Sequence, residues 1–107
     1  MKIAVPATGG SMSARVSEQF GRCAYFLVVD TRDMRFEPIH NPGAEATGGA
    51  GPQAAQELIR RGVEVVLTGS LGPKAAQVLE RAGIKVVSGI SAEKTVKEAV
   101  EEYLHPS

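Results

Sequence analysis

The sequence predicts an α/β protein in which a five-stranded mixed β-sheet carries helices on both of its faces. Two observations support this fold class. Short apolar runs typical of buried strands alternate, in the second half, with longer stretches whose apolar residues recur at helical spacing. In the first half, two strand-like segments are separated by a turn too short to hold a helix. A chain of 107 residues fits one domain, which we expect to span residues 1–107.

The first half predicts three strands. Residues 3–5 form a short apolar strand, followed by a polar, glycine-bearing stretch. Residues 24–30 contain a nearly continuous apolar run, as in strands that are covered on both faces. After a tight turn, residues 34–40 alternate between two faces, and Pro38 places this strand at a sheet edge because proline cannot donate a ladder hydrogen bond. The second and third strands therefore form an antiparallel hairpin.

The second half predicts helices that alternate with strands. One helix begins at Pro52 and ends at Gly62, and the next begins at Pro73 and ends at Gly83. The last helix is expected after Ser91, which resembles an N-cap and has Lys94 three positions later.

Strands at residues 63–67 and 84–87 separate these helices. Because strands joined through helices are usually parallel with right-handed crossovers, we expect the sheet order 3-2-1-4-5 with only strand two antiparallel. This is a three-layer arrangement of the ribonuclease H-like kind.

Composition excludes several classes of protein. Hydrophobic residues make up 43% and charged residues 22%, an ordinary globular balance. The 12 basic and 12 acidic residues cancel, whereas a nucleic-acid-binding protein would show a basic excess. The sequence has neither an apolar run of about 18 residues for a membrane span nor the pattern of a signal peptide. We expect a cytoplasmic protein, and the single cysteine agrees with a reducing compartment.

The predicted topology brings three unusual loops to one edge of the sheet. Strands one, three and four end there, in the loops at residues 7–22, 41–51 and 68–72, and strand two begins there near Cys23. In open α/β sheets, ligands bind outside the carboxyl ends of strands where the connections diverge. That point lies here between strands one and four, so we expect a binding site at this edge.

Two of these loops are rich in glycine and lead into helices. They are Gly48-Gly49-Ala50-Gly51 and Gly69-Ser70-Leu71-Gly72. Unpaired N–H groups at a helix N-terminus favour an anion, and glycine lets a ligand approach the backbone closely. The same glycines also suit a simple turn between strand and helix. Neither loop matches the dinucleotide-binding fingerprint or the lysine-containing phosphate-binding loop.

Cys23 and His40 are the candidate metal ligands. Cys23 follows Arg22, which would lower the pKa of the thiol, but a small apolar residue at the start of a core strand is an alternative interpretation. His40 ends an edge strand beside a glycine loop and could bind metal as a neutral imidazole, although a lone histidine is more often a surface residue.

An enzymatic site has little support. A two-metal nuclease of this fold needs paired carboxylates on strands one and four, where only Glu64 is present. The sequence also contains neither a Ser–His–Asp order nor a two-histidine zinc spacing.

Four motifs together resemble one known family over nearly the whole chain. Residues 17–23, Ser-Glu-Gln-Phe-Gly-Arg-Cys, are similar to its S-x-H-F-G-R-A signature. Asn41-Pro42 with the glycines at 48–51 is similar to its second loop, residues 69–75 to its G-x-x-G-P-x-A loop, and residues 82–86 to its last strand. The family is that of dinitrogenase iron–molybdenum cofactor biosynthesis, which includes NifX-like carriers and the C-terminal domain of NifB.

The resemblance implies a domain that binds and carries an iron–sulfur or iron–molybdenum-type cofactor precursor and catalyses nothing. It implies a metal–sulfur cluster or a related small anion as ligand and a cluster-assembly protein as partner, with neither nucleic acid nor membrane. Where carriers often have a histidine, this chain has Gln19, a poor iron ligand. The alternative is a protein-interaction or regulatory module that uses the same loops without a cluster. The expected cofactor-binding residues are Ser11, Gln19, Phe20, Gly21, Arg22, Cys23, Asn41, Gly48, Gly49, Gly51, Gly69 and Gly72.

Overall fold

The computed structural model describes residues 1–46 and 48–106 of the chain. The sheet has the order β3-β2-β1-β4-β5; β2 is antiparallel to both of its neighbours, and β1, β4 and β5 are parallel. The predicted five-stranded mixed sheet is confirmed. The elements, in chain order, are β1 (Lys2–Ala7), β2 (Tyr25–Asp30), β3 (Arg35–His40), α1 (Ala50–Arg60), β4 (Val65–Leu67), α2 (Pro73–Arg81), β5 (Lys85–Val87) and α3 (Val96–Leu104).

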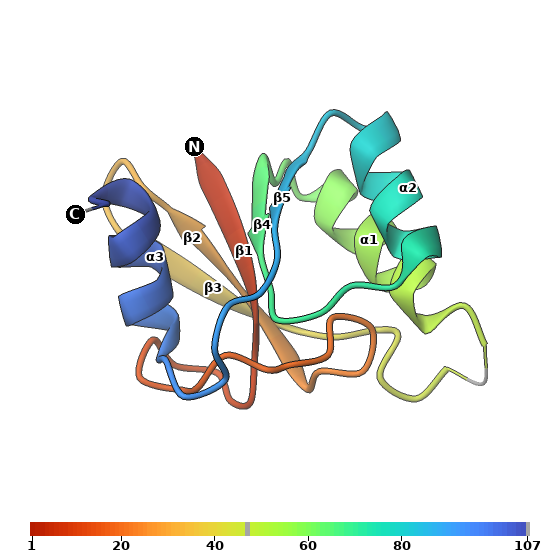
Figure 1. Ribbon diagram of the computed structural model, residues 1–107, viewed down its shortest axis with the longest axis horizontal. Coiled ribbons are helices and arrows are strands. Elements are labelled where there is room, and N and C mark those ends of the chain that lie inside the picture. Colours follow the sequence, from red (N-terminus) through yellow and green to blue (C-terminus); the bar gives the residue numbers. More distant parts are fainter. Residues whose placement is uncertain (47, 107) are drawn as a thin grey trace.

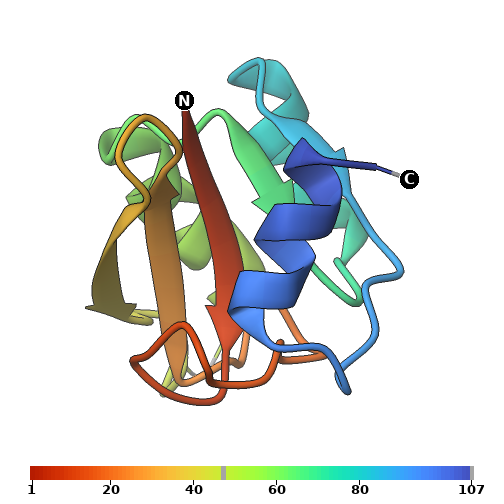
Figure 2. The ribbon, with the colours of Figure 1, turned by 90° about the vertical axis from the view of Figure 1, so that its left-hand side faces the viewer.

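Helices cover both faces of this sheet, as expected. Two views at right angles show α3 on one face and α1 with α2 on the other (Figure 1, Figure 2). Because side chains along a strand alternate between faces, β1 directs Ala4 into the cluster with α1 and α2, and Ile3 and Val5 into the cluster with α3. In β2, Phe26 belongs to the cluster with α1 and α2, and Leu27 belongs to the cluster with α3. Both faces are buried, which explains why these strands are apolar at successive positions.

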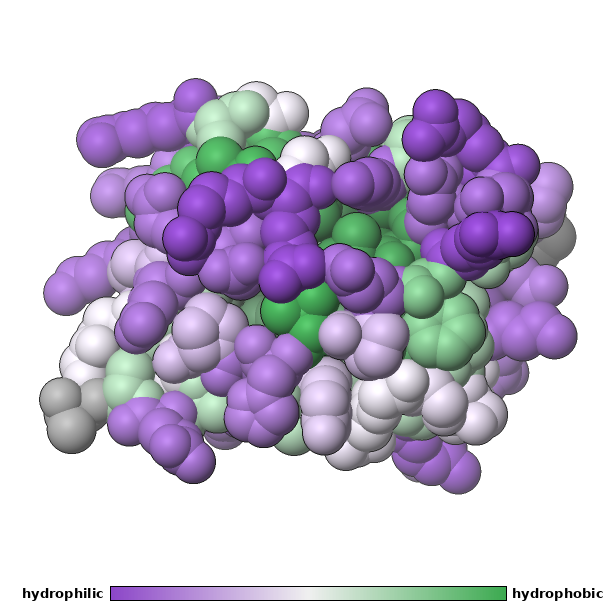
Figure 3. All heavy atoms as spheres, turned by 180° about the vertical axis from the view of Figure 1, so that it is seen from behind, coloured by the Kyte–Doolittle hydropathy of each residue, from purple (hydrophilic) through white to green (hydrophobic). Residues whose placement is uncertain are grey.

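β3 forms one edge of the sheet, as Pro38 predicts. β3 pairs with β2 along its whole length, from Tyr25 opposite His40 to Asp30 opposite Arg35. Of the six residues of β3 only Ile39 is buried. Seen from behind, the surface is mainly hydrophilic, and hydrophobic residues show in limited areas between hydrophilic ones (Figure 3).

The last helix begins later than the sequence suggested. Thr95, and not Ser91, is the N-cap of α3: its side chain accepts a hydrogen bond from the N–H of Glu98 at 3.1 Å, and the Glu98 carboxylate accepts one from the N–H of Thr95 at 2.9 Å. This reciprocal capping box cannot form from Ser91 and Lys94, because a lysine side chain has no acceptor. The Oγ of Ser91 instead accepts from the N–H of Glu93 at 3.1 Å, in the turn before the helix.

The other helix boundaries lie within two residues of expectation. α1 begins at Ala50, so Pro52 lies in the first turn, where its missing N–H leaves no bond unmade. Gly62 and Gly83 follow α1 and α2 with φ of 76° and 78°, a left-handed conformation that glycine adopts readily. None of the helices formed by the described residues has the length and apolarity needed to cross a bilayer.

Candidate functional site

Ends of all five strands meet on one side of the sheet, which we call the loop edge. β1, β3, β4 and β5 end there and β2 begins there, so residues 8–24, 41–46, 48–49, 68–72 and 88–95 all lie on this side, at the bottom of Figure 1. The first three segments were expected. Residues 88–95 were missed, although the signal was available: β5 is parallel to β4, so its carboxyl end lies at the same edge.

Residues 8–24 cross the loop edge and pair with the segments on either side. The N–H and Oγ of Ser70 both donate to the carbonyl of Glu18, at 2.8 and 2.7 Å. Further along, the N–H of Val16 donates to the carbonyl of Lys94 at 2.9 Å. This crossing segment therefore joins the loop before α2 to the turn before α3.

The crossing segment also lies against both glycine loops. A Cβ on Gly21 would be 3.0 Å from the amide nitrogen of Gly51, and a Cβ on Gly69 would be 3.0 Å from the carbonyl oxygen of Glu18. Side chains at these positions would separate the backbones, so glycine permits the close contact. Residues 18–21 therefore lie against both glycine loops, which do not face one another across an open cleft.

Gly48, Gly49 and Gly72 remain open, since a Cβ on any of them would have no neighbour within 4 Å. Gly49 and Gly72 are the N-caps of α1 and α2, and no described residue provides either helix with a side-chain cap. In α3 the capping box binds a backbone N–H of the first turn. The first-turn N–H groups of α1 and α2 have no such partner among the described side chains. Uncapped amides together with the helix dipole favour an anion.

Asn41 holds two of the loops together from inside the protein and is only 2% exposed. Its Nδ2 donates to the carbonyls of Gly21 at 3.1 Å and Cys23 at 3.0 Å, and its Oδ1 accepts from the N–H of Gly43 at 2.8 Å. Both sides of the amide are therefore used within the chain. The structure places Asn41 as a support for the loop edge rather than on its surface.

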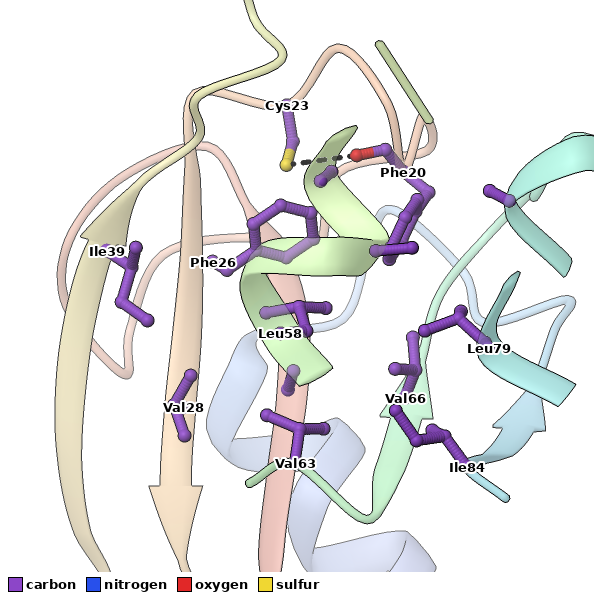
Figure 4. Packing of buried hydrophobic residues seen from close by; sticks show 14 residues of the cluster. Phe20, Cys23, Phe26, Val28, Ile39, Leu58, Val63, Val66, Leu79 and Ile84 are labelled. Carbon is purple, nitrogen blue, oxygen red and sulfur yellow. Dashed lines mark hydrogen bonds between the residues drawn. The ribbon is translucent and has the colours of Figure 1, made fainter. Parts of the chain in front are cut away.

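Cys23 lies in the core beneath the loop edge. It is 3% exposed, and its Sγ is 3.4 Å from the carbonyl oxygen of Phe20 (Figure 4). Burial raises the pKa of the thiol from 9.0 to about 12, because the thiolate would lose its hydration. The guanidinium of Arg22, which we expected to lower this pKa, donates instead to the carbonyl of Ala46 at 2.6 Å. Cys23 is thus a neutral core residue in this structure, and iron ligation would require the thiol to leave the core.

The remaining candidates are divided between surface and core. His40 is exposed, and its ring meets that of Tyr25 edge-on at a centroid distance of 5.3 Å. Ser11 and Gln19 are exposed in the crossing segment, whereas Phe20 is buried. In the parts of the chain that the structure describes, no group of three or more His, Cys, Asp and Glu side chains is arranged to hold a metal ion.

An open hollow of about 380 Å³ lies between the crossing segment and the turn before α3. Arg15 was not among the expected residues: no motif marks it, and only the fold brings it to the same hollow as Arg22. A second hollow of about 350 Å³ adjoins the first and shares Glu18 and Ala92 with it. The first hollow, which we call the arginine hollow, is lined by Thr8, Arg15, Val16, Ser17, Glu18, Gln19, Arg22 and Ala92.

Known proteins resemble this chain along most of its length. A family model described as dinitrogenase iron–molybdenum cofactor matches residues 1–105. The apo form of the orange protein from Desulfovibrio gigas is 43% identical, with a TM-score of 0.92 over 96% of this chain and 86% of that chain. A Thermotoga protein described as a NifB protein is 33% identical, with a TM-score of 0.84 over 98% of this chain and 88% of that chain.

A more distant structure shares the fold alone. It is described as a dinitrogenase from Methanocaldococcus jannaschii and is 14% identical, with a TM-score of 0.71 over 97% of this chain and 88% of that chain. No curated protein sequence matches the chain.

Proposed function

Because the chain belongs to the dinitrogenase iron–molybdenum cofactor family, we propose that residues 1–107 form one non-catalytic domain that binds and carries an iron–molybdenum-type cofactor or its iron–sulfur precursor. Its resemblance to the orange protein and to a NifB protein supports this role. The cluster is here a cargo, taken up from one protein and passed to another.

The observation that carries the proposal is the arginine hollow at the loop edge. It lies outside the carboxyl ends of the strands, where open α/β sheets bind ligands, and two of the loop-edge segments, residues 8–24 and 88–95, line it. It is open to solvent on one side, which suits a cargo that must enter and leave. The two arginines that line it suit an anion better than an uncharged ligand.

We propose that the hollow holds the cluster without a protein–metal bond. The thiol of Cys23 lies in the core with a raised pKa, and only the thiolate binds iron well. Gln19 stands where carriers often have a histidine, and its amide is a poor iron ligand. Contact with the cluster would then come from charged and hydrogen-bonding groups at the surface.

The test is to prepare the protein anaerobically in a host supplied with iron and molybdenum, and to measure its metal content and ultraviolet–visible spectrum. Two variants with the same substitution sharpen it. Gln19→Trp would fill the arginine hollow, whereas Gln56→Trp would place the same side chain on the exposed face of α1.

We expect metal and cluster absorption in the wild type and in Gln56→Trp, and their loss in Gln19→Trp. A wild-type protein that acquires neither metal nor colour, also after incubation with a preformed iron–sulfur cluster, would favour the interaction module instead. Equal loading of both variants would show that the cluster binds elsewhere.

A further inference from the structure

Two arginines at the loop edge, Arg15 and Arg22, lack the carboxylate partner that four of the seven arginines have within the described residues; Arg81, at the far end of α2, also lacks one there. Arg32, Arg35, Arg60 and Arg61 each form an ion pair with a carboxylate. Arg15 and Arg22 form no such pair with the described residues. Within the described part of the chain, their guanidinium groups donate only to backbone carbonyls, Arg15 to Glu93 and Arg22 to Ala44 and Ala46.

Backbone carbonyls leave much of the capacity of these two side chains unused. A guanidinium has five N–H donors, and a neutral carbonyl does not balance its charge. In both residues the hydrogen bonds to described residues are made through Nη1. Other donors of each side chain are therefore available to a ligand in the arginine hollow that both residues line.

The local charge of the hollow differs from that of the whole protein. The chain carries 12 basic and 12 acidic residues, so it has no net charge that would attract an anion from a distance. The hollow is lined by two arginines and by one carboxylate, that of Glu18. Glu18 is exposed and forms no ion pair with the described residues. Among the residues that line the hollow, the positive charges therefore outnumber the negative one.

We propose that Arg15 and Arg22 form a clamp that binds a compact ligand carrying at least two negative charges, and that the opposing charge of Glu18 sets how tightly the ligand is held. The inference rests on the proposed function, whose ligand it describes: a polyanion recognised by charge and by hydrogen bonds from two guanidinium groups. Two sources share this chemistry. One is an anionic metal–sulfur cluster, and the other is a free tetrahedral oxyanion.

The experiment measures the affinity of two probes for the full chain under anaerobic conditions. One probe is a synthetic tetranuclear iron–sulfur cluster with thiolate ligands, a dianion, and the other is molybdate. Five variants are compared with the wild type: Arg15→Gln, Arg22→Gln, Arg22→Lys, Glu18→Gln and Arg81→Gln. Arg81 is the matched control, because it lies in the last turn of α2, at the end of the helix away from the loop edge.

We expect each of the two clamp substitutions to weaken binding of the cluster about fivefold at low salt, as for an exposed charge pair. Glu18→Gln should tighten it by a similar factor, and Arg81→Gln should leave it unchanged. The affinity of the wild type for the cluster should decrease as the salt concentration is raised from about 0.01 M to about 1 M. Over this range the Debye length shortens from about 30 Å to about 3 Å, so charges are screened more strongly. Arg22→Lys is the control for the contact that Arg22 makes with the neighbouring loop. The substitution keeps the positive charge, so this variant should retain most of the affinity for the cluster.

The outcomes separate the clamp from the proposed function. Cluster binding that is unchanged in Arg15→Gln, Arg22→Gln and Glu18→Gln would overturn the clamp and leave the carrier function standing. Binding of molybdate with these charge effects, but no binding of the cluster, would support the clamp and overturn the carrier function. A wild-type protein that binds neither probe would overturn both.

Discussion

Replacing Gly43 by alanine should destabilise the protein more than any comparable change in its loops. A Cβ at this position would lie 2.5 Å from the carbonyl oxygen of Ala50, the first residue of α1, and 3.2 Å from its carbonyl carbon. Ordinary contact begins at 3.4 Å, so about 0.9 Å is missing. The obstacle is helix backbone, which cannot rotate away as a side chain would.

The displacement would reach the loop edge. The N–H of Gly43 is bound by Asn41, and Asn41 in turn binds the carbonyls of Gly21 and Cys23. Either the start of α1 or this buried connection must shift. Overpacking of this kind costs about 1–3 kcal/mol. For a domain of this size the melting temperature should fall by about 4 °C for each kcal/mol.

Gly48→Ala is the matched control. A Cβ at Gly48 would have no neighbour within 4 Å, so the free energy of unfolding should stay within about 0.5 kcal/mol of the wild type. Urea unfolding at constant pH would measure both variants, with an unchanged denaturant slope showing that the unfolded state is unaffected. Equal stability of the two variants would refute the argument, because the only difference it invokes is the contact with Ala50.

Three further predictions concern the thiol and the helix caps. The folded-state pKa of Cys23 is raised from 9.0 to about 12, so the contribution of the neutral thiol is complete below pH 9 and is lost as pH rises through 12. The stability difference between wild type and Cys23→Ala should therefore shrink by up to about 4 kcal/mol over this range; a difference that does not change with pH would contradict the burial argument. Thr95→Ala should cost about 1 kcal/mol in urea unfolding and Ser91→Ala less than half of that, because only Thr95 caps α3; the reverse order would restore Ser91 as the cap. Gly72→Asp should stabilise the protein by about 0.5 kcal/mol in urea unfolding, because aspartate supplies the side-chain N-cap that α2 lacks; an unchanged or lowered stability would contradict this.

The topology could be predicted because its signals are local. Pro38 marks an edge strand, the tight turn before it forces a hairpin, and glycine and proline delimit α1 and α2. The start of α3 was predicted wrongly, although the sequence holds the better signal. Thr95 followed by Glu98 is a complete capping box, whereas Ser91 lacks an acidic partner.

The site could be predicted as a place but not as a set of contacts. That the loops meet at one edge follows from the direction of the strands. The contact of residues 18–21 with Gly51 and Gly69 could not be predicted in this way. It depends on the path of the crossing segment, which contains no strand or helix. Arg22 and Cys23 are neighbours in the chain, yet one reaches across the loop surface and the other lies in the core. No local pattern separates these two outcomes.

Binding by charge rather than by coordination has a consequence for a carrier. A bond between a protein thiolate and iron must be exchanged before a cluster can move on, whereas a cluster held by Arg15 and Arg22 leaves when a more positive or better-coordinating site comes near. The open side of the arginine hollow gives such an acceptor access. On this proposal Glu18 opposes tight binding, so that the holding of the cluster is balanced against its release. Glu18→Gln should therefore load more fully but deliver cluster more slowly to a thiol-containing acceptor, as followed by absorbance. Faster delivery from this variant would show that release is not limited by the charge of the hollow.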